Sequence, residues 1–177
     1  MRLVESAFDI DVRMFRWCQK RRYRKGLIVL ARQLSHTADG YLYVAIGLLA
    51  LYFEYYAFVV IAGVGFVTER CVYFCAKNHF KRNRPPDILP GFKSVVVASD
   101  KFSFPSGHTS AAFLMTVSIV IYFPSLAWVL FPWAISVGWS RVMLGVHFPG
   151  DTMAGALLGS TVALLVYDNL NSSLSFL

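Results

Sequence analysis

Five long apolar runs constrain this sequence more than any other feature. They cover residues 40–53, 55–76, 106–123, 126–143 and 152–167. A helix of about 20 apolar residues can cross a bilayer, and 56% of the chain is hydrophobic against 15% charged, which suits a chain surrounded by lipid. The sequence therefore predicts an all-α fold, a polytopic membrane helical bundle of about five spans. A second large domain does not fit beside these spans within 177 residues.

The N-terminal segment, residues 1–39, has a different pattern. Apolar side chains are interspersed with polar ones and followed by a basic run from Lys20 to Lys25. Such a segment is typical of one or two amphipathic helices lying in the membrane interface, although a solvated basic tail is the alternative. We therefore divide the chain into an interfacial amphipathic segment, 1–39, and a membrane-embedded domain, 40–177.

The number of spans brings the polar segments together. With five crossings, the N-terminus, the polar stretch 77–104, the start of the third span and the turn 144–151 share one membrane face. The net charge of +7 could indicate nucleic acid, but the positive residues border apolar runs, which favours lipid headgroups and anionic substrates. We expect the bilayer and a lipid phosphate as partners and no nucleic acid. Gly155 and Gly159 can pack either inside the bundle or between copies, so the oligomeric state is open.

Three clusters of polar residues lie on this predicted face. They are Lys77 with Arg84 and Pro85; Ser106, Gly107 and His108 after Pro105; and Arg141 with His147 and Asp151. The three cations would repel one another unless an anion neutralised them, and the arginine fork matches a phosphate group. The start of a helix adds backbone N–H donors, and glycine lets an oxygen approach closely. The pattern predicts a phosphate-binding site.

Two histidines accompany these cations. Hydrolysis of a phosphate ester without a metal needs a nucleophile and an acid that protonates the leaving oxygen. Asp151 is spaced to orient His147, so we assign His147 as the nucleophile and His108 as the general acid. The phosphate would be held by Lys77, Arg84, Ser106, Gly107 and Arg141. We predict no metal and no cofactor, because the chain has only four histidines and no cluster of carboxylates at ligand spacing beside them.

Together the three clusters resemble the signature of the type 2 phosphatidic acid phosphatase family, which includes the vanadium haloperoxidases and glucose-6-phosphatase. The resemblance covers roughly residues 40–167, with all three motifs in order. It implies a metal-independent phosphoric or diphosphoric monoester hydrolase that acts through a phosphohistidine, with 40–177 as the phosphatase domain. Bacterial members suggest undecaprenyl pyrophosphate, phosphatidylglycerophosphate, phosphatidate or a lipid A phosphate as substrate. A vanadium peroxidase is disfavoured because those members are soluble.

Two other functions use the same residues. A membrane phosphotransferase would form the same intermediate and pass the phosphoryl group to an acceptor other than water. A non-catalytic protein could hold a lipid headgroup with the cations alone. Binding alone would not require His108, His147 and Asp151, which favours the enzyme.

The side of the membrane is not fixed by the sequence. The positive-inside rule places the basic N-terminus, and with it the whole polar face, in the cytoplasm. The resemblance to small bacterial lipid phosphatases implies the extracytoplasmic side. We expect a bacterial inner (cytoplasmic) membrane protein with an extracytoplasmic site.

Other polar residues receive structural interpretations. Charge inside a span is costly unless it is paired, so Glu69 and Arg70 are expected to form an ion pair that supports the cations, ahead of direct substrate contact. His36 and Asp39 are expected to form a hydrogen bond where the first span begins. His79 is interpreted as a solvated side chain.

The three cysteines cannot all pair with one another. Cys71 and Cys75 lie one helical turn apart in an apolar run, whereas Cys18 lies in the N-terminal segment. We expect all three to be small buried hydrophobic side chains.

Overall fold

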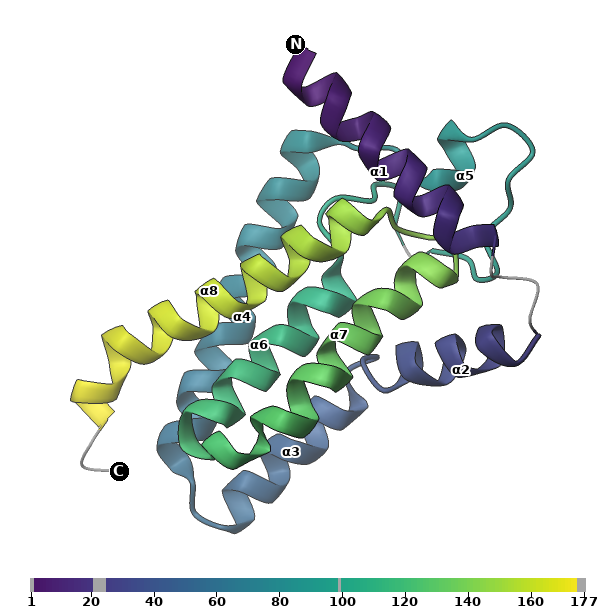
Figure 1. Ribbon diagram of the computed structural model, residues 1–177. Helices are drawn as coiled ribbons and strands as arrows, with labels where there is room; N and C mark the ends of the chain where they lie inside the picture. Colours follow the sequence, from purple (N-terminus) through teal and green to yellow (C-terminus); the bar gives the residue numbers. More distant parts are fainter. Residues whose placement is uncertain (1, 21–24, 99, 175–177) are drawn as a thin grey trace.

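Helices account for the architecture throughout the described residues, which are 2–20, 25–98 and 100–174 of the computed structural model (Figure 1). The bundle consists of α3 (Tyr41–Tyr52), α4 (Tyr56–Phe80), α6 (Gly107–Tyr122), α7 (Ala127–Met143) and α8 (Pro149–Leu174). The remaining elements are α1 (Arg2–Lys20), α2 (Lys25–His36), α5 (Pro85–Ile88) and the 3₁₀ turn η1 (Pro124–Leu126). The predicted all-α membrane bundle is confirmed.

The bundle helices differ in length. Three segments, which contain α4, α7 and α8, are long and apolar enough to cross a membrane, whereas α3 and α6 are apolar but shorter. Two predicted boundaries were wrong. Helix α4 continues to Phe80, so Lys77 lies on a helix instead of in a loop, and Lys81 ends this helix in the left-handed conformation (φ 46°). The polar stretch 77–104 also contains α5, which begins at two prolines that suit a first helical turn.

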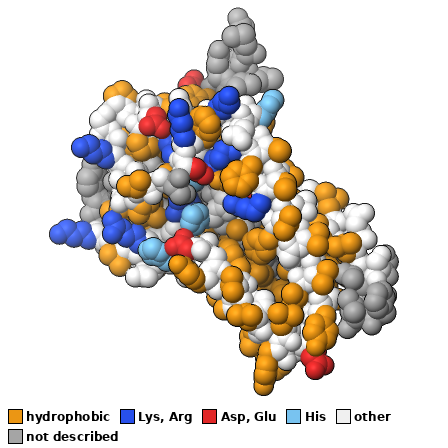
Figure 2. All heavy atoms as spheres, turned by 180° about the vertical axis from the view of Figure 1, so that it is seen from behind, with side chains coloured by type: hydrophobic (Ala, Val, Ile, Leu, Met, Phe, Trp, Pro, Cys, Tyr) orange, Lys and Arg blue, Asp and Glu red, His pale blue; other side chains and the backbone are white. Residues whose placement is uncertain are grey.

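Helix α6 lies at the centre of the bundle and contacts α4, α7 and α8. Leu114 of α6 is buried between Ile61 of α4 and Val162 of α8. The outer faces of the bundle are also apolar, and Figure 2 shows hydrophobic side chains covering the end of the molecule away from the charged groups. A bundle that is apolar both inside and outside is what a lipid solvent requires.

The cysteines follow this division between core and outer face. Cys71 and Cys75 are exposed on α4, and Cys18 is half-buried. The expectation of burial was therefore wrong for Cys71 and Cys75, because an apolar side chain of a membrane helix is as stable against lipid as against protein.

Two glycines of α8 bring its backbone against α6. A Cβ atom added to Gly155 would lie 2.5 Å from the carbonyl oxygen of Ser106, and one added to Gly159 would overlap the carbonyl oxygen of Ser110. Glycine at both positions therefore permits a backbone contact that any side chain would prevent. The Gly155–Gly159 face packs inside the bundle, as one of the two sequence alternatives proposed.

The two N-terminal helices cover the polar end of the bundle. Helix α2 packs on α7, and α1 crosses the ends of α7 and α8 (Figure 1). On α1, Phe15 is buried against Val142 and Phe148. Its exposed apolar side chains include Ile10, Met14 and Trp17. Helix α1 thus has one face on the protein and one apolar face outward. Arg21, Arg22 and Arg24 of the basic run lie outside the described residues.

Replacing Gly159 by Ala should destabilise the bundle. The new methyl group would force α6 and α8 apart, and overpacking of this kind costs about 1–3 kcal/mol of unfolding free energy. Thermal unfolding of the purified protein in detergent measures the effect. Gly63→Ala is the matched control, because no described atom lies within 4 Å of a Cβ atom added at Gly63. Equal stability of the two variants would contradict close α6–α8 packing.

Candidate functional site

The three sequence clusters converge at one end of the bundle. Lys77 lies in the last turns of α4, and Arg84 immediately precedes α5. Arg141 lies in the last turn of α7, and Asp151 in the first turn of α8. Figure 2 shows Lys, Arg and His side chains gathered at this end. Lys77, Arg84, Arg141, His147 and Asp151 are all buried there.

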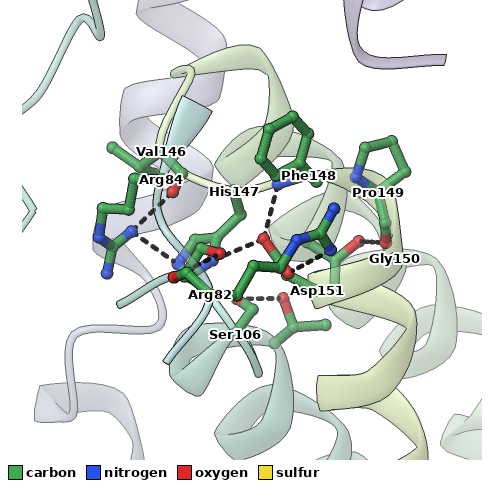
Figure 3. A network of polar contacts seen from close by, with 12 residues as sticks. Arg82, Arg84, Ser106, Val146, His147, Phe148, Pro149, Gly150 and Asp151 are labelled. Carbon is green, nitrogen blue, oxygen red and sulfur yellow. Dashed lines mark hydrogen bonds and ion pairs between the residues drawn. The ribbon is translucent and has the colours of Figure 1, made fainter. Parts of the chain in front are cut away.

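His147 presents its two ring nitrogens to groups of opposite charge (Figure 3). Its Nε2 atom lies 3.4 Å from Nη1 of Arg84, and its Nδ1 atom lies 3.7 Å from Oδ2 of Asp151. The second distance is too long for a hydrogen bond, and Oδ2 of Asp151 instead accepts a hydrogen bond from the backbone N–H of Phe148 at 2.8 Å. His147 Nδ1 is buried without a hydrogen-bond partner in the described part of the chain. The predicted pair is adjacent, but the predicted direct hydrogen bond is absent.

The surroundings of His147 favour its neutral form. Burial, with the charges of Arg141 and Arg84, lowers the pKa of His147 to about 4, although Asp151 acts in the opposite direction. At neutral pH the imidazole therefore carries one proton. A neutral ring retains a free lone pair on one nitrogen, which a nucleophile needs.

Asp100 neutralises two of the predicted phosphate-binding cations. Its carboxylate binds Nζ of Lys77 at 2.5 Å and the guanidinium of Arg84, and it accepts a hydrogen bond from the hydroxyl of Tyr73 at 2.7 Å. Burial raises the pKa of Asp100, but hydrogen bonds from Lys77, Tyr73 and Arg84 bring it down to about 2. An internal anion therefore lies between the cations where the sequence predicted phosphate.

Arg141 and His108 line a second part of the site, a cavity of about 210 Å³. Arg141 donates to the hydroxyl of Ser35 at 2.5 Å, and its buried Nε has no hydrogen-bond partner among the described residues. A buried cationic donor without a partner is costly. The N–H group at Arg141 Nε is therefore available to donate a hydrogen bond to an oxygen of an incoming anion.

His108 is held by a carboxylate. Its Nε2 atom lies 2.9 Å from Oδ1 of Asp39, and Nδ1 of His36 lies 2.7 Å from Oδ2 of the same side chain. Burial raises the pKa of Asp39, but these hydrogen bonds outweigh it and lower the pKa below its ordinary value. The predicted His36–Asp39 contact is present, and Asp39 additionally connects α2 to the site.

Ser106 and Gly107 begin α6 beside Asp151. The backbone N–H of Ser106 donates to the carbonyl oxygen of Asp151 at 2.9 Å, and the Ser106 hydroxyl lies 3.0 Å from that of Thr109. A Cβ atom on Gly107 would lie 3.1 Å from the Tyr73 ring. Glycine thus lets α6 start against Tyr73, and the first N–H groups of a helix have no partner within the helix.

Tyr73 also connects the site to the predicted ion pair. Arg70 binds Glu69 through two hydrogen bonds of 2.6 and 2.7 Å, and Glu69 is fully buried. The Arg70 guanidinium lies 4.2 Å from the centre of the Tyr73 ring, and Tyr73 contacts Lys77 and Asp100. The ion pair is present as expected, and Tyr73 lies between it and Lys77. His79 is exposed, as expected for a solvated side chain.

Sequence reasoning missed four charged residues at this end of the molecule. Asp39 and Asp100 pair with predicted site residues, and Arg82 binds Asp151 and also Asp11 of α1. The topology placed all four on the polar face, which was the available signal, but it did not predict their contacts with the site residues. Within the described ranges, no group of three or more His, Cys, Asp or Glu side chains is arranged to hold a metal ion.

Comparison with known proteins assigns this arrangement to a family. The family model of the PAP2 superfamily matches residues 54–173. The chain belongs to the PAP2 superfamily. Helices α4 to α8, except for the last residue of α8, lie within the matched region with all the predicted site residues, whereas α1, α2 and α3 precede it. The resemblance noted in the three sequence motifs is confirmed.

Relatives within the PAP2 superfamily include two bacterial proteins. Decaprenylphosphoryl-5-phosphoribose phosphatase from Mycobacterium tuberculosis is 34% identical over 151 residues, which cover 81% of this chain and 80% of that protein. The bacitracin transport permease protein BcrC from Bacillus licheniformis is 32% identical over 109 residues, which cover 62% of this chain and 54% of BcrC. The match therefore spans about half the length of BcrC.

A solved structure shows the same fold. The first transmembrane PAP2-type phosphatidylglycerolphosphate phosphatase from Bacillus subtilis superimposes with a TM-score of 0.76 and 23% identity, covering 98% of this chain and 89% of that one. The likeness extends over the described helices of both the matched region and the N-terminal part. It shows that this chain shares the helical fold of that protein. The three segments long and apolar enough to cross a membrane, with membership of the PAP2 superfamily, support an integral membrane protein.

Replacing Asp100 by Asn should strengthen the binding of inorganic phosphate. The carboxylate would no longer neutralise Lys77 and Arg84, so an anion would not have to displace it. Because a hydrogen bond to a charged group contributes about 1.5–3 kcal/mol, we expect phosphate affinity to rise about tenfold or more. The phosphate-dependent shift in melting temperature, measured in detergent at constant ionic strength, gives the affinity.

Asp87→Asn is the control for this prediction. The Asp87 carboxylate accepts a hydrogen bond from the backbone N–H of Arg84 at 3.3 Å, and an Asn side chain can accept the same bond. We expect its phosphate affinity to match that of the wild type. Unchanged affinity in Asp100→Asn would show that Asp100 does not compete with anions.

Proposed function

We propose that the protein is an integral-membrane phosphatase that hydrolyses a lipid phosphate or lipid pyrophosphate through a phosphohistidine on His147. The observation that carries this proposal is the placement of the His147 ring, with Nε2 toward Arg84 and Nδ1 toward Asp151. A neutral ring in this position can attack a phosphorus atom held by the cations. Membership of the PAP2 superfamily and the phosphatase named among its relatives support the same reaction class.

The first step forms a bond between Nε2 of His147 and phosphorus and breaks the bond from phosphorus to the leaving oxygen. His108 gives its proton to that oxygen, and Asp39, 2.9 Å from its Nε2 atom, holds the ring in place. Positive charge then develops on the His147 ring, and the Nδ1–Asp151 distance would shorten into a hydrogen bond. Asp151 stabilises this charge as the aspartate of a catalytic triad does.

The second step releases phosphate. Water attacks the phosphohistidine, His108 accepts a proton from that water, and the bond between phosphorus and Nε2 breaks. In both steps Lys77, Arg84 and Arg141 stabilise the charge on the phosphoryl oxygens, together with the Ser106 hydroxyl and the backbone N–H of Gly107. These side-chain cations supply positive charge that other phosphatases obtain from a metal ion, so we propose that the reaction is metal-independent.

The substrate class follows from the surroundings of the site. The cations lie at the end of a bundle whose outer faces are apolar, so a headgroup can reach the site while its chains stay in the bilayer. The Mycobacterium tuberculosis relative is named for a decaprenyl-linked substrate. A polyprenyl-linked phosphate or pyrophosphate is therefore the first substrate to test, followed by phosphatidylglycerophosphate, phosphatidate and a lipid A phosphate.

Phosphate release in the presence of EDTA tests the proposal. The wild type should hydrolyse at least one lipid of this panel in EDTA, and His147→Ala should lower kcat by more than about a thousandfold while remaining folded. His79→Ala is the matched control, since this exposed histidine lies at the end of α4 outside the site. Turnover retained in His147→Ala would refute the nucleophile assignment. Phosphate transfer to a second substrate would indicate a phosphotransferase, and binding without turnover a headgroup-binding protein.

We further propose that residues 40–177 form the phosphatase domain and that its site faces the extracytoplasmic side of a bacterial inner membrane. Helix α8 begins at the site and runs to the other end of the bundle (Figure 1). A reporter fused after Leu177 should therefore be cytoplasmic. Alkaline phosphatase and green fluorescent protein fusions give opposite readouts, and an active alkaline phosphatase fusion would place the site in the cytoplasm instead.

A further inference from the structure

Arg82 joins the N-terminal helix to the pair formed by His147 and Asp151. Its Nη1 atom donates to Oδ1 of Asp151 at 2.8 Å, and its Nη2 atom donates to Oδ2 of Asp11 at 2.6 Å (Figure 3 shows the contact with Asp151). The Asp151 side chain is fully buried, and those of Arg82 and Asp11 are mostly buried. Ion pairs withdrawn from water in this way are strongly coupled, because removal of one partner leaves an uncompensated charge.

Asp11 also fixes the start of α8. Its second oxygen, Oδ1, accepts a hydrogen bond from the backbone N–H of Gly150 at 2.8 Å. A Cβ atom on Gly150 would lie 2.8 Å from Oδ2 of Asp11, so glycine allows this close approach. The carboxylate lies at the positive end of the α8 dipole, which stabilises a negative charge. One side chain of α1 therefore holds both Arg82 and the turn that carries Asp151.

Aromatic packing keeps α1 in this place. The Phe148 ring is fully buried, with its centre 5.3 Å from that of Phe15 on α1. The Arg82 guanidinium lies over the Phe148 ring, 4.5 Å from its centre. The backbone N–H of Phe148 binds Oδ2 of Asp151. Both oxygens of Asp151 are thus fixed, one by Arg82 and one by Phe148.

These contacts decide how Asp151 acts on His147. A carboxylate neutralised by Arg82 attracts a proton to His147 less strongly than a free carboxylate would. The other charged groups facing His147 are Arg84 at the start of α5 and Arg141 of α7, and both disfavour a protonated ring. Loss of Arg82 would leave the negative charge of Asp151 to be balanced by a proton on His147.

We propose that Arg82, held by Asp11 of α1, is a positioning residue that fixes Asp151 beside His147 and keeps the nucleophile neutral, so that α1 is part of the phosphatase site. The proposal rests on the proposed function, in which His147 attacks phosphorus. Asp11 lies before residues 54–173, which the PAP2 family model matches. Arg82 lies between Lys77 and Arg84 of the first motif, where the sequence pattern assigned it no role. The exposed apolar side chains of α1, including Ile10 and Met14, suit contact with the bilayer, so the membrane would help to hold α1 on the site.

The test compares Arg82→Gln, Arg82→Lys and Asp11→Asn with the wild type in detergent. In metal sites, the residues that orient the ligands typically contribute 10- to 100-fold to activity, and we take the same range for Arg82. We expect kcat to fall about 10- to 100-fold in Arg82→Gln and less in Asp11→Asn, with KM nearly unchanged. Lysine can bind one carboxylate but cannot span both, so Arg82→Lys should recover part of the loss. Asp9→Asn is the matched control, an exposed carboxylate on the same helix, and should behave as the wild type.

The protonation of His147 gives a readout that a merely structural contact would not change. In ¹⁵N-histidine-labelled protein, the resonance that disappears in His147→Gln reports this ring. We expect the pKa of His147 to rise by about one unit in Arg82→Gln, because removal of a cation next to Asp151 favours protonation. The acidic limb of kcat/KM should move to higher pH in the same direction.

The outcomes separate this inference from the proposed function. Wild-type kcat and an unchanged His147 titration in Arg82→Gln would overturn the inference while leaving the phosphohistidine intact. An inactive wild type, or an active His147→Ala, would refute the proposed function, and the His147 titration would still decide whether Arg82 controls the ring. If Arg82→Gln does not fold, the isosteric Asp11→Asn variant carries the same comparison, and an unchanged titration there would reject the role of α1.

Discussion

The backbone contact between α6 and α8 holds the two halves of the site together. Gly155 and Gly159 let the helices meet without side chains between them, and the N–H of Ser106 then reaches the carbonyl oxygen of Asp151. The first turn of α6 carries Ser106, Gly107 and His108, and the first turn of α8 follows His147. Their relative position is therefore fixed by a rigid contact between main chains instead of by flexible side chains.

Pairing of buried charge is the second constraint at this end. Asp100 accompanies Lys77 and Arg84, Asp11 and Asp151 accompany Arg82, and Glu69 accompanies Arg70. Arg141 differs, since its described partner is the neutral hydroxyl of Ser35. In an apolar environment, ions of this kind are stable only when they are paired so that their net charge is close to zero. The resting site is thus close to balanced, and an entering anion has to exchange partners with carboxylates already present.

The sequence predicted those features that depend on local patterns. Apolar runs located the bundle helices, and the spacing from His147 to Asp151 predicted two side chains that the structure places side by side. The end of α4 was misplaced because the polar residues after Ala76 suggested a loop, whereas a helix at a membrane surface can carry Lys77 and His79 in its last turns. Exposed Cys71 and Cys75 show the same difficulty, since lipid and protein interiors favour the same side chains.

The residues that escaped prediction depend on contacts between distant parts of the chain. Arg82 meets Asp11 and Asp151, and Asp100 meets Lys77, only once α1, α4 and α8 have packed with the loop segments that carry Arg82 and Asp100. A lone carboxylate in a polar stretch carries no sign of its partner. The number of membrane crossings places such residues on the correct face, but their partners can be identified only from the three-dimensional arrangement.

The unequal lengths of α4 and α6 have a mechanical consequence for a lipid substrate. The rings of Tyr55 and Phe123 lie 5.5 Å apart, so the two helices share a level at the far end, yet α4 has 25 residues and α6 has 16. At about 1.5 Å per residue, the first residue of α6 lies roughly 14 Å short of the last residue of α4 along the bundle. Relative to the end of α4, the start of α6 is thus displaced toward the middle of the bundle. For the proposed lipid substrate, a headgroup bound at this depth would leave its chains in the membrane, so the work of extracting the lipid would be avoided.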